Sequence, residues 1–185
     1  MTGSGYPPLL SHILEGKEYG PMLRSPDVAQ HWTEWRNLFR GLIDCPPKDH
    51  AIANCFHTQL HVSHHFIRQL VDDDALLMDV MRVWLPRYEG PSLVLYRGEN
   101  IDRFEIGKVG TAWIDQEKTA LTFASGLNAV GKGGVILLTN APAIAIIAGP
   151  SPHSANWLHE NEFTLDTRKL GEIERLTEFS PSHQL

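Results

Sequence analysis

The hydrophobic pattern of this chain changes near Gly90, and that change limits the folds open to it. Before Gly90, apolar residues recur every three or four positions, which is the spacing of one face of an α-helix. After it, they gather in short runs rich in Val, Ile and Leu, which favour β-strands. Because strands follow helices instead of alternating with them, we predict an α+β fold. A helical lobe over 1–90 should pack on a mostly antiparallel sheet formed by 91–185, as one compact domain.

Three helices are predicted in the first region, over 27–42, 51–71 and 73–85. The earliest begins at Ser25-Pro26-Asp27, since Ser25 is a typical N-cap and proline is tolerated in a first turn. It ends before Pro46-Pro47, because proline lacks the N–H that would continue the helix. The apolar stripe of this helix consists of Val28, Trp32, Trp35, Leu38, Phe39 and Leu42.

Four or five strands and one short helix are predicted in the second region. The candidate strands cover 93–96, 107–114, 134–139, 143–147 and 162–166, with a turn at Asn140-Ala141-Pro142. The short helix covers 118–124 and should turn Leu121 and Phe123 inward. Residues 131–134 are glycine-rich but precede a strand, whereas a phosphate-binding loop follows a strand and opens a helix. We therefore interpret them as a tight turn.

The composition narrows the choice of partners. A chain of 185 residues, 42% of them hydrophobic, can bury a proper core. A net charge of −6 argues against nucleic-acid binding, which needs clustered cations.

No apolar stretch approaches the roughly 20 residues of a membrane span, and the first ten residues lack a secretory pattern. We expect a cytoplasmic protein that binds no membrane, or one delivered into a target cell by a dedicated machine. Cys45 and Cys55 are expected to be reduced, buried thiols.

Four histidines fall within the second predicted helix: His57, His61, His64 and His65. Steps of four place His57, His61 and His65 on one helical face. Zinc sites use such spacings, but the HExxH pattern is absent and Cys55 lies off that face. We interpret the histidines as partly exposed helix residues, and we expect no metal site.

Three short motifs carry residues suited to chemistry. Arg97-Gly98 ends the first strand, where a guanidinium can hold a phosphate and a glycine lets a ligand approach; an ordinary salt bridge is the alternative. Residues 110–124 form a strand that leads into a helix, and Trp113 offers either a stacking surface or a core residue. Glu160-Asn161-Glu162 opens the last strand, where alternation can turn both carboxylates to one side; a solvated loop is the alternative.

In this order, the three motifs resemble those of the mono-ADP-ribosyltransferase superfamily, in its toxin-like branch with an Arg–Ser–Glu triad. The resemblance covers Leu93 to Arg168, about the last half of the chain, and the Glu-x-Glu motif is part of it. It implies a split β-sheet of ADP-ribosyltransferase type, with residues 91–185 as the NAD-binding region. The N-terminal helices match no motif of that family.

The resemblance implies a role for each residue that binds NAD. Arg97, with Gly98 beside it, would hold a phosphate. Thr111 or Ala112 would take the place of the family's serine, which contacts the ribose and orients the glutamate, and only Thr111 offers a hydroxyl. Trp113 would stack on a ring or fill the core. Phe123 would pack beneath the nicotinamide pocket or fill the core.

The glutamates would carry the chemistry in this comparison. Glu162 would stabilise the cationic ribose as nicotinamide leaves. Glu160 would face the acceptor, and in the family a glutamate there goes with arginine as the modified residue. Asn156–His159 would form the acceptor-recognition turn, with Trp157 as a contact. Arg97 and Glu162 would have to meet in one pocket.

The resemblance thus implies an enzyme that transfers ADP-ribose from NAD to a protein side chain, with arginine favoured, and releases nicotinamide. NAD would be consumed as a substrate, so no permanently bound cofactor is expected. Two alternatives stay open. One is an NAD glycohydrolase, in which water replaces the protein acceptor. The other is a catalytically inactive binding module, which the atypical segment Thr111-Ala112-Trp113 keeps open. The acceptor and the biological role, such as that of a toxin or effector, are also open.

Overall fold

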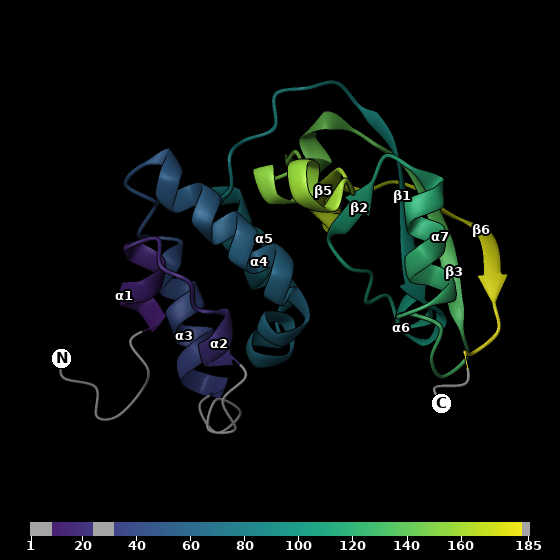
Figure 1. Cartoon of the computed structure of the whole chain (residues 1–185), viewed down its shortest axis with the longest axis horizontal. Coiled ribbons are helices and arrows are strands. Elements are labelled where there is room, and N and C mark those ends of the chain that lie inside the picture. The colour runs from purple at the N-terminus through teal and green to yellow at the C-terminus, as the bar shows by residue number, and fades with distance from the viewer. Residues whose placement is uncertain (1–8, 24–31, 183–185) are drawn as a thin grey trace. The chain divides into compact units, whose positions relative to one another are not determined.

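The computed structural model describes residues 9–23 and 32–182, and the chain divides between Pro86 and Arg87 into two compact units (Figure 1). The first unit is helical, and the second contains the β-sheet. The division lies close to Gly90, where the hydrophobic pattern changes. Among the described residues, none of the helices is long and apolar enough to cross a lipid bilayer.

The described residues of the first unit, 9–23 and 32–86, form five helices. They are α1 (Leu9–Leu14), α2 (Gly20–Leu23), α3 (Trp32–Leu42), α4 (His50–Val71) and α5 (Asp74–Trp84). The predicted helices 51–71 and 73–85 are confirmed as α4 and α5. Each has an aspartate N-cap: Asp49 accepts the Ile52 N–H at 2.9 Å, and Asp73 accepts the Leu76 N–H at 3.0 Å. The predicted start of the first helix at Ser25 lies outside the described residues.

Large apolar side chains fill the centre of this unit. Phe56 and Trp84 pack with ring centroids 4.9 Å apart, and the Trp84 indole N–H donates to the carbonyl of Leu42 at 2.9 Å. Two expectations for this region are wrong. His57 is buried instead of partly exposed, because it lies among the buried residues Phe56 and Leu60 of α4, whereas His65 further along the helix is exposed. Cys45 is exposed, because it lies in the loop after α3, while Cys55 is partly buried.

The second unit is built on one six-stranded sheet in the order β4-β5-β2-β1-β3-β6. Its strands are β1 (Leu93–Asn100), β2 (Ala112–Ile114), β3 (Gly134–Ala141), β4 (Ile146–Ala148), β5 (Glu162–Leu165) and β6 (Ile173–Phe179). Its helices are α6 (Ile101–Glu105) and α7 (Glu117–Ser125), with short helical turns at η2 (Ala143–Ala145), η3 (Ser154–Leu158) and η4 (Thr167–Lys169). Each pairing of neighbouring strands is antiparallel. The predicted α+β class with a mostly antiparallel sheet is confirmed.

Several predicted boundaries in this unit are wrong. The strand predicted over 107–114 is reduced to β2: Gly107 adopts a left-handed backbone with φ of 74°, and the N–H of Gly110 bonds to the Glu99 side chain instead of a neighbouring strand. The strand predicted over 143–147 is instead the turn η2 followed by β4. Pro142 precedes that turn and has no N–H for a ladder. Leu121 does not face inward, since the buried positions of α7 are Ala120 and Ala124.

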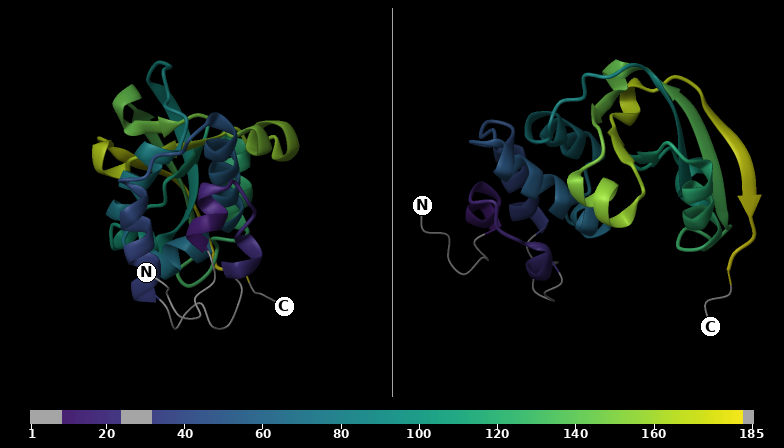
Figure 2. Two further views of the ribbon diagram at one scale, coloured as in Figure 1. Left: turned by 90° about the vertical axis from the view of Figure 1, so that its left-hand side faces the viewer. Right: turned by 45° about the horizontal axis from the view of Figure 1, so that its top comes forward.

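Helix α7 packs closely on β1 and β3, and the right-hand view in Figure 2 shows it beside these strands. Glycine makes this approach possible. A Cβ at Gly98 would lie 2.4 Å from the Ala120 carbonyl oxygen, and one at Gly134 would lie 1.8 Å from that of Ala124. Gly134 also belongs to the predicted glycine turn, which is confirmed, with φ of 60° at Gly131. The face of β1 that carries Gly98 is therefore covered by a helix.

The two faces of the sheet carry separate apolar clusters. On the α7 face, Ile114 and Ile136 pack with the alanines of that helix. On the opposite face, the buried residues come from every strand except β6. They are Leu95, Trp113, Val135, Leu137, Ala141, Ile146, Phe163 and Leu165, joined by Ile101 from α6. Because side chains alternate along a strand, neighbouring strand residues contribute to opposite faces of the sheet.

Candidate functional site

The junction between β1 and β2 holds the first group of candidate residues. Backbone pairing joins these two strands at a single position, Tyr96↔Ile114, whereas β1 pairs with β3 along all of its length. Side chains supply the other links. The Arg97 guanidinium donates through Nη1 to the carbonyl of Ala112, and through Nε to Oε2 of Glu99 at 2.9 Å. Arg97 thus connects β1 to the start of β2.

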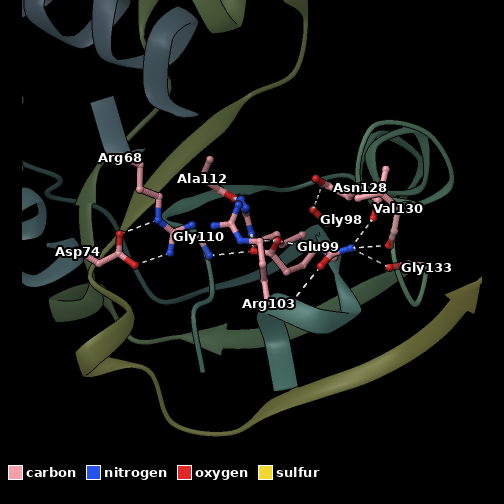
Figure 3. A network of polar contacts seen from close by, with 12 residues as sticks. Arg68, Asp74, Gly98, Glu99, Arg103, Gly110, Ala112, Asn128, Val130 and Gly133 are labelled. Atoms are coloured by element: carbon pink, nitrogen blue, oxygen red, sulfur yellow. Dashed lines mark hydrogen bonds and ion pairs between the residues drawn. The ribbon is translucent and has the colours of Figure 1, made fainter. Parts of the chain in front are cut away.

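Glu99 is the centre of this junction, as Figure 3 shows. Its side chain is 0% exposed and that of Arg97 is 14% exposed, so the pair is largely removed from water. Oε2 also accepts the Gly110 N–H at 2.9 Å, and Oε1 accepts the Asn100 N–H at 2.9 Å. Burial alone would raise the pKa of Glu99. The Arg97 charge and the two backbone donors outweigh that effect, and the pKa lies below its ordinary value.

Two glycines adapt the backbone to this network. A Cβ at Gly110 would lie 2.1 Å from Nη2 of Arg97, so only glycine leaves room for the guanidinium. Gly98 was expected to let a ligand approach beside Arg97. The structure corrects this expectation: the space beside Gly98 is occupied by Ala120, Phe123 and Ala124 of α7. Gly98 therefore allows α7 to pack closely against β1.

Residues 111–113, which the resemblance sets in the place of a serine motif, lie next to this network. Trp113 is 0% exposed, and its indole N–H donates to the Gly110 carbonyl at 3.0 Å. The ring is therefore a core residue and not an exposed stacking surface. Phe123 is partly buried and packs against the cluster on the α7 face. Thr111 is buried and precedes β2, while Ala112 begins that strand and is partly buried.

Glu160 and Glu162 are brought together. A carboxylate oxygen of Glu160 lies within 4.8 Å of one of Glu162, and both side chains are partly buried. The residues on either side of Glu160 adopt left-handed backbone conformations, with φ of 55° at His159 and 48° at Asn161. Such conformations are costly for residues with a Cβ and concentrate at functional sites. Two anions held this close favour a cation placed against them.

Strand register relates these glutamates to β2. Glu162 pairs with Ile114, and Thr164 pairs with Ala112. Opposite residues in an antiparallel pair share a face, so Ala112 and Glu162 lie on the same face as diagonal neighbours, about 7 Å apart. Thr111 lies before the strand. Of the two candidates for the serine position, Ala112 is the one whose side chain shares a face with Glu162.

Arg97 and Glu162 are not brought together by the sheet. Their strands are separated by β2, which places them about 10 Å apart at ordinary strand spacing. Tyr96, Ile114 and Glu162 form one row across the three strands and share a face. Arg97 follows Tyr96 directly, so its side chain leaves the strand on the opposite face. The expectation of one pocket shared by Arg97 and Glu162 is not met by this register.

Two residues of this region were missed by the sequence analysis. Glu99 stands inside a strand with no pattern that marks a buried carboxylate. Ser154 stands at the start of η3, and its hydroxyl bonds to the backbone of Glu162. A serine shortly before a Glu-x-Glu motif was the only available signal for it. The side chain of Trp157, an expected acceptor contact, lies outside the described part of the structure.

Comparison of the chain with family models, with curated proteins and with solved structures gives no match.

Proposed function

We propose that this protein cleaves NAD and transfers its ADP-ribose to a protein side chain, with arginine as the favoured acceptor. One observation carries the proposal: the carboxylates of Glu160 and Glu162 lie within 4.8 Å of each other on a constrained loop. The order of motifs along the sequence, which resembles that of mono-ADP-ribosyltransferases, supplies the reaction.

The proposed step breaks the bond between the ribose C1′ and the nicotinamide nitrogen, and the bonding electrons leave with nicotinamide. The ribosyl group becomes cationic as this bond lengthens. A fixed carboxylate near the ribose stabilises that charge, and this is the role proposed for Glu162. An acceptor nitrogen then attacks C1′ and loses a proton. Guanidinium is a poor nucleophile because it is protonated in water, so Glu160 would receive that proton.

The contacts of Arg97 favour a different role from the phosphate contact implied by the resemblance. Two of its donor groups are engaged by Glu99 and by the Ala112 carbonyl. Ala112 shares a face with Glu162, and β2 pairs directly with β5. We therefore assign Arg97 to holding β2 beside the glutamate-bearing strand. Under this proposal, the reacting groups lie on the Glu162 face of the sheet.

The test is an assay with NAD labelled in its adenylate part, incubated with the protein and a whole-cell lysate. Wild type is expected to transfer label to lysate proteins and to release nicotinamide. Glu160→Gln is expected to lose ADP-ribose transfer to proteins while still releasing nicotinamide slowly. Water can replace the protein acceptor in that slow reaction, and no guanidinium then has to be deprotonated. The matched control is Glu174→Gln, which removes an exposed carboxylate from β6.

Two outcomes would replace the proposal with an alternative. Rapid nicotinamide release without transfer to any protein would indicate an NAD glycohydrolase. If wild type neither releases nicotinamide nor transfers ADP-ribose, the protein would be a binding module. Such a role would agree with Ala112 in the serine position, because its methyl group offers no hydroxyl for catalysis.

A further inference from the structure

The glutamate pair is attached to a buried serine that the proposed reaction does not use. Ser154 is 0% exposed and begins the helical turn η3. Its hydroxyl oxygen accepts the N–H of Glu162 at 2.9 Å, and its carbonyl accepts the N–H of Glu160 at 3.2 Å. The same carbonyl accepts the N–H of His159. One residue thus binds the backbone of both glutamates.

Ser154 is itself held in place. Its own N–H donates to the hydroxyl oxygen of Ser151 at 3.0 Å, and the Ser151 carbonyl accepts the N–H of Ala155 at 2.9 Å. Both serines are buried, so water does not compete for these bonds. The turn η3 is a π-helical turn, a form that is rare and frequent at functional sites.

The backbone of the loop explains why such an attachment is needed. His159 and Asn161 hold left-handed conformations on either side of Glu160, and neither is glycine. Left-handed residues with a Cβ persist when surrounding contacts hold them in place. Three bonds to Ser154 do so here, while the Asn161 side chain adds a longer contact of 3.4 Å to Asp115. Without the Ser154 hydroxyl, the N–H of Glu162 loses its bond at the point where β5 begins.

We propose that Ser154 is the positioning residue for the Glu160–Glu162 pair, and that its hydroxyl fixes the carboxylate of Glu162 for NAD cleavage. This inference rests on the proposed function. The hydroxyl touches no reacting atom and acts through the backbone of Glu162. It should therefore change the rate of the chemical step and leave the binding of NAD unchanged.

The experiment compares wild type, Ser154→Ala and Ser125→Ala. Ser125 is the matched control, since its hydroxyl donates to the Leu121 carbonyl at 2.8 Å on the exposed end of α7. The first readout is amide hydrogen exchange at Glu162, measured by NMR without NAD. Ser154→Ala should speed this exchange about fivefold through loss of one hydrogen bond. The second readout is nicotinamide release, where kcat should fall about tenfold and KM for NAD should stay within about twofold.

The outcomes separate the two proposals. Faster exchange with a lower kcat and an unchanged KM, seen in Ser154→Ala and not in Ser125→Ala, supports the role of Ser154. If Ser154→Ala exchanges faster but its kcat is unchanged, Ser154 has no positioning role, although NAD cleavage stands. The same conclusion follows if exchange at Glu162 is unchanged in Ser154→Ala. Wild type that releases no nicotinamide overturns the proposed function, and the role of Ser154 in it, whatever the exchange shows.

Discussion

The substitution Glu99→Gln tests the electrostatic network that joins β1 to β2. Gln keeps the size of Glu99 but removes the charge that faces Arg97, and its amide nitrogen cannot accept a bond. In the wild type, the carboxylate accepts from Arg97, Gly110 and Asn100. Removing one partner of a buried ion pair costs about 3 kcal/mol at the lower end of the measured range. We use that lower end because the Gln oxygen can still accept one or two of these bonds.

The cost of Glu99→Gln should depend on pH. The pKa of Glu99 lies below its ordinary value in the folded protein, because the Arg97 charge and two backbone donors overcome the effect of burial. Its contribution is therefore complete above the unfolded value of about 4.3, and it is lost as pH falls through the lowered folded value. The assay is urea unfolding of wild type, Glu99→Gln and the surface control Glu174→Gln between about pH 7 and about pH 3. A difference between wild type and Glu99→Gln that is negligible at neutral pH, or grows on acidification, would refute the reasoning.

Three further substitutions test other contacts. Gly98→Ala should lower the free energy of unfolding by about 2 kcal/mol in urea, because the new Cβ would lie 2.4 Å from the Ala120 carbonyl; unchanged stability would mean that α7 packs less closely. Tyr19→Phe should leave stability unchanged or raise it by about 1 kcal/mol, because the buried hydroxyl has no hydrogen-bond partner among the residues that the structure describes; a clear loss in thermal unfolding would indicate one. Ala112→Ser should speed nicotinamide release several-fold by placing a hydroxyl on the face of Glu162, and a slower rate would count against Ala112 as the serine position.

The longer helices α4 and α5 could be predicted because their signals are local, whereas the short helices α1 and α2 were not predicted. The apolar stripe of α4 and the aspartates before α4 and α5 mark faces and N-termini without knowledge of other elements. The buried face of His57 could not be predicted this way. A histidine suits both the core and the surface, and only packing decides between them.

The strands were predicted less well because their lengths depend on partners. The run 93–96 was expected as a strand, but β1 continues to Asn100 because Glu99 and Asn100 pair with Val135 and Gly134 of β3. Glu160 and Glu162 lie close together as predicted, but strand alternation is not the cause, because β5 begins at Glu162 and Asn161 has a left-handed φ of 48°. The separation of Arg97 from Glu162 was not predicted, because it depends on the register between β1, β2 and β5.

The buried partners Glu99 and Ser154 show where sequence reasoning ends. A carboxylate in a strand is ordinarily exposed, and burial is tolerated here because an arginine and two backbone N–H groups meet it. Arg97 and Asn100 are near Glu99 in the sequence, but the third group comes from a different segment, since Gly110 lies eleven positions from Glu99. Only the folded arrangement reveals such a convergence.

The central claim is that the Glu162 carboxylate stabilises the ribosyl cation formed from NAD. The most direct measurement is steady-state nicotinamide release by purified wild type and Glu162→Gln, with thermal unfolding recorded for both. Removing one such electrostatic contact should lower kcat about a hundred- to a thousandfold, while KM for NAD changes by less than about threefold. A well-folded Glu162→Gln protein that turns over NAD as fast as wild type would contradict the account.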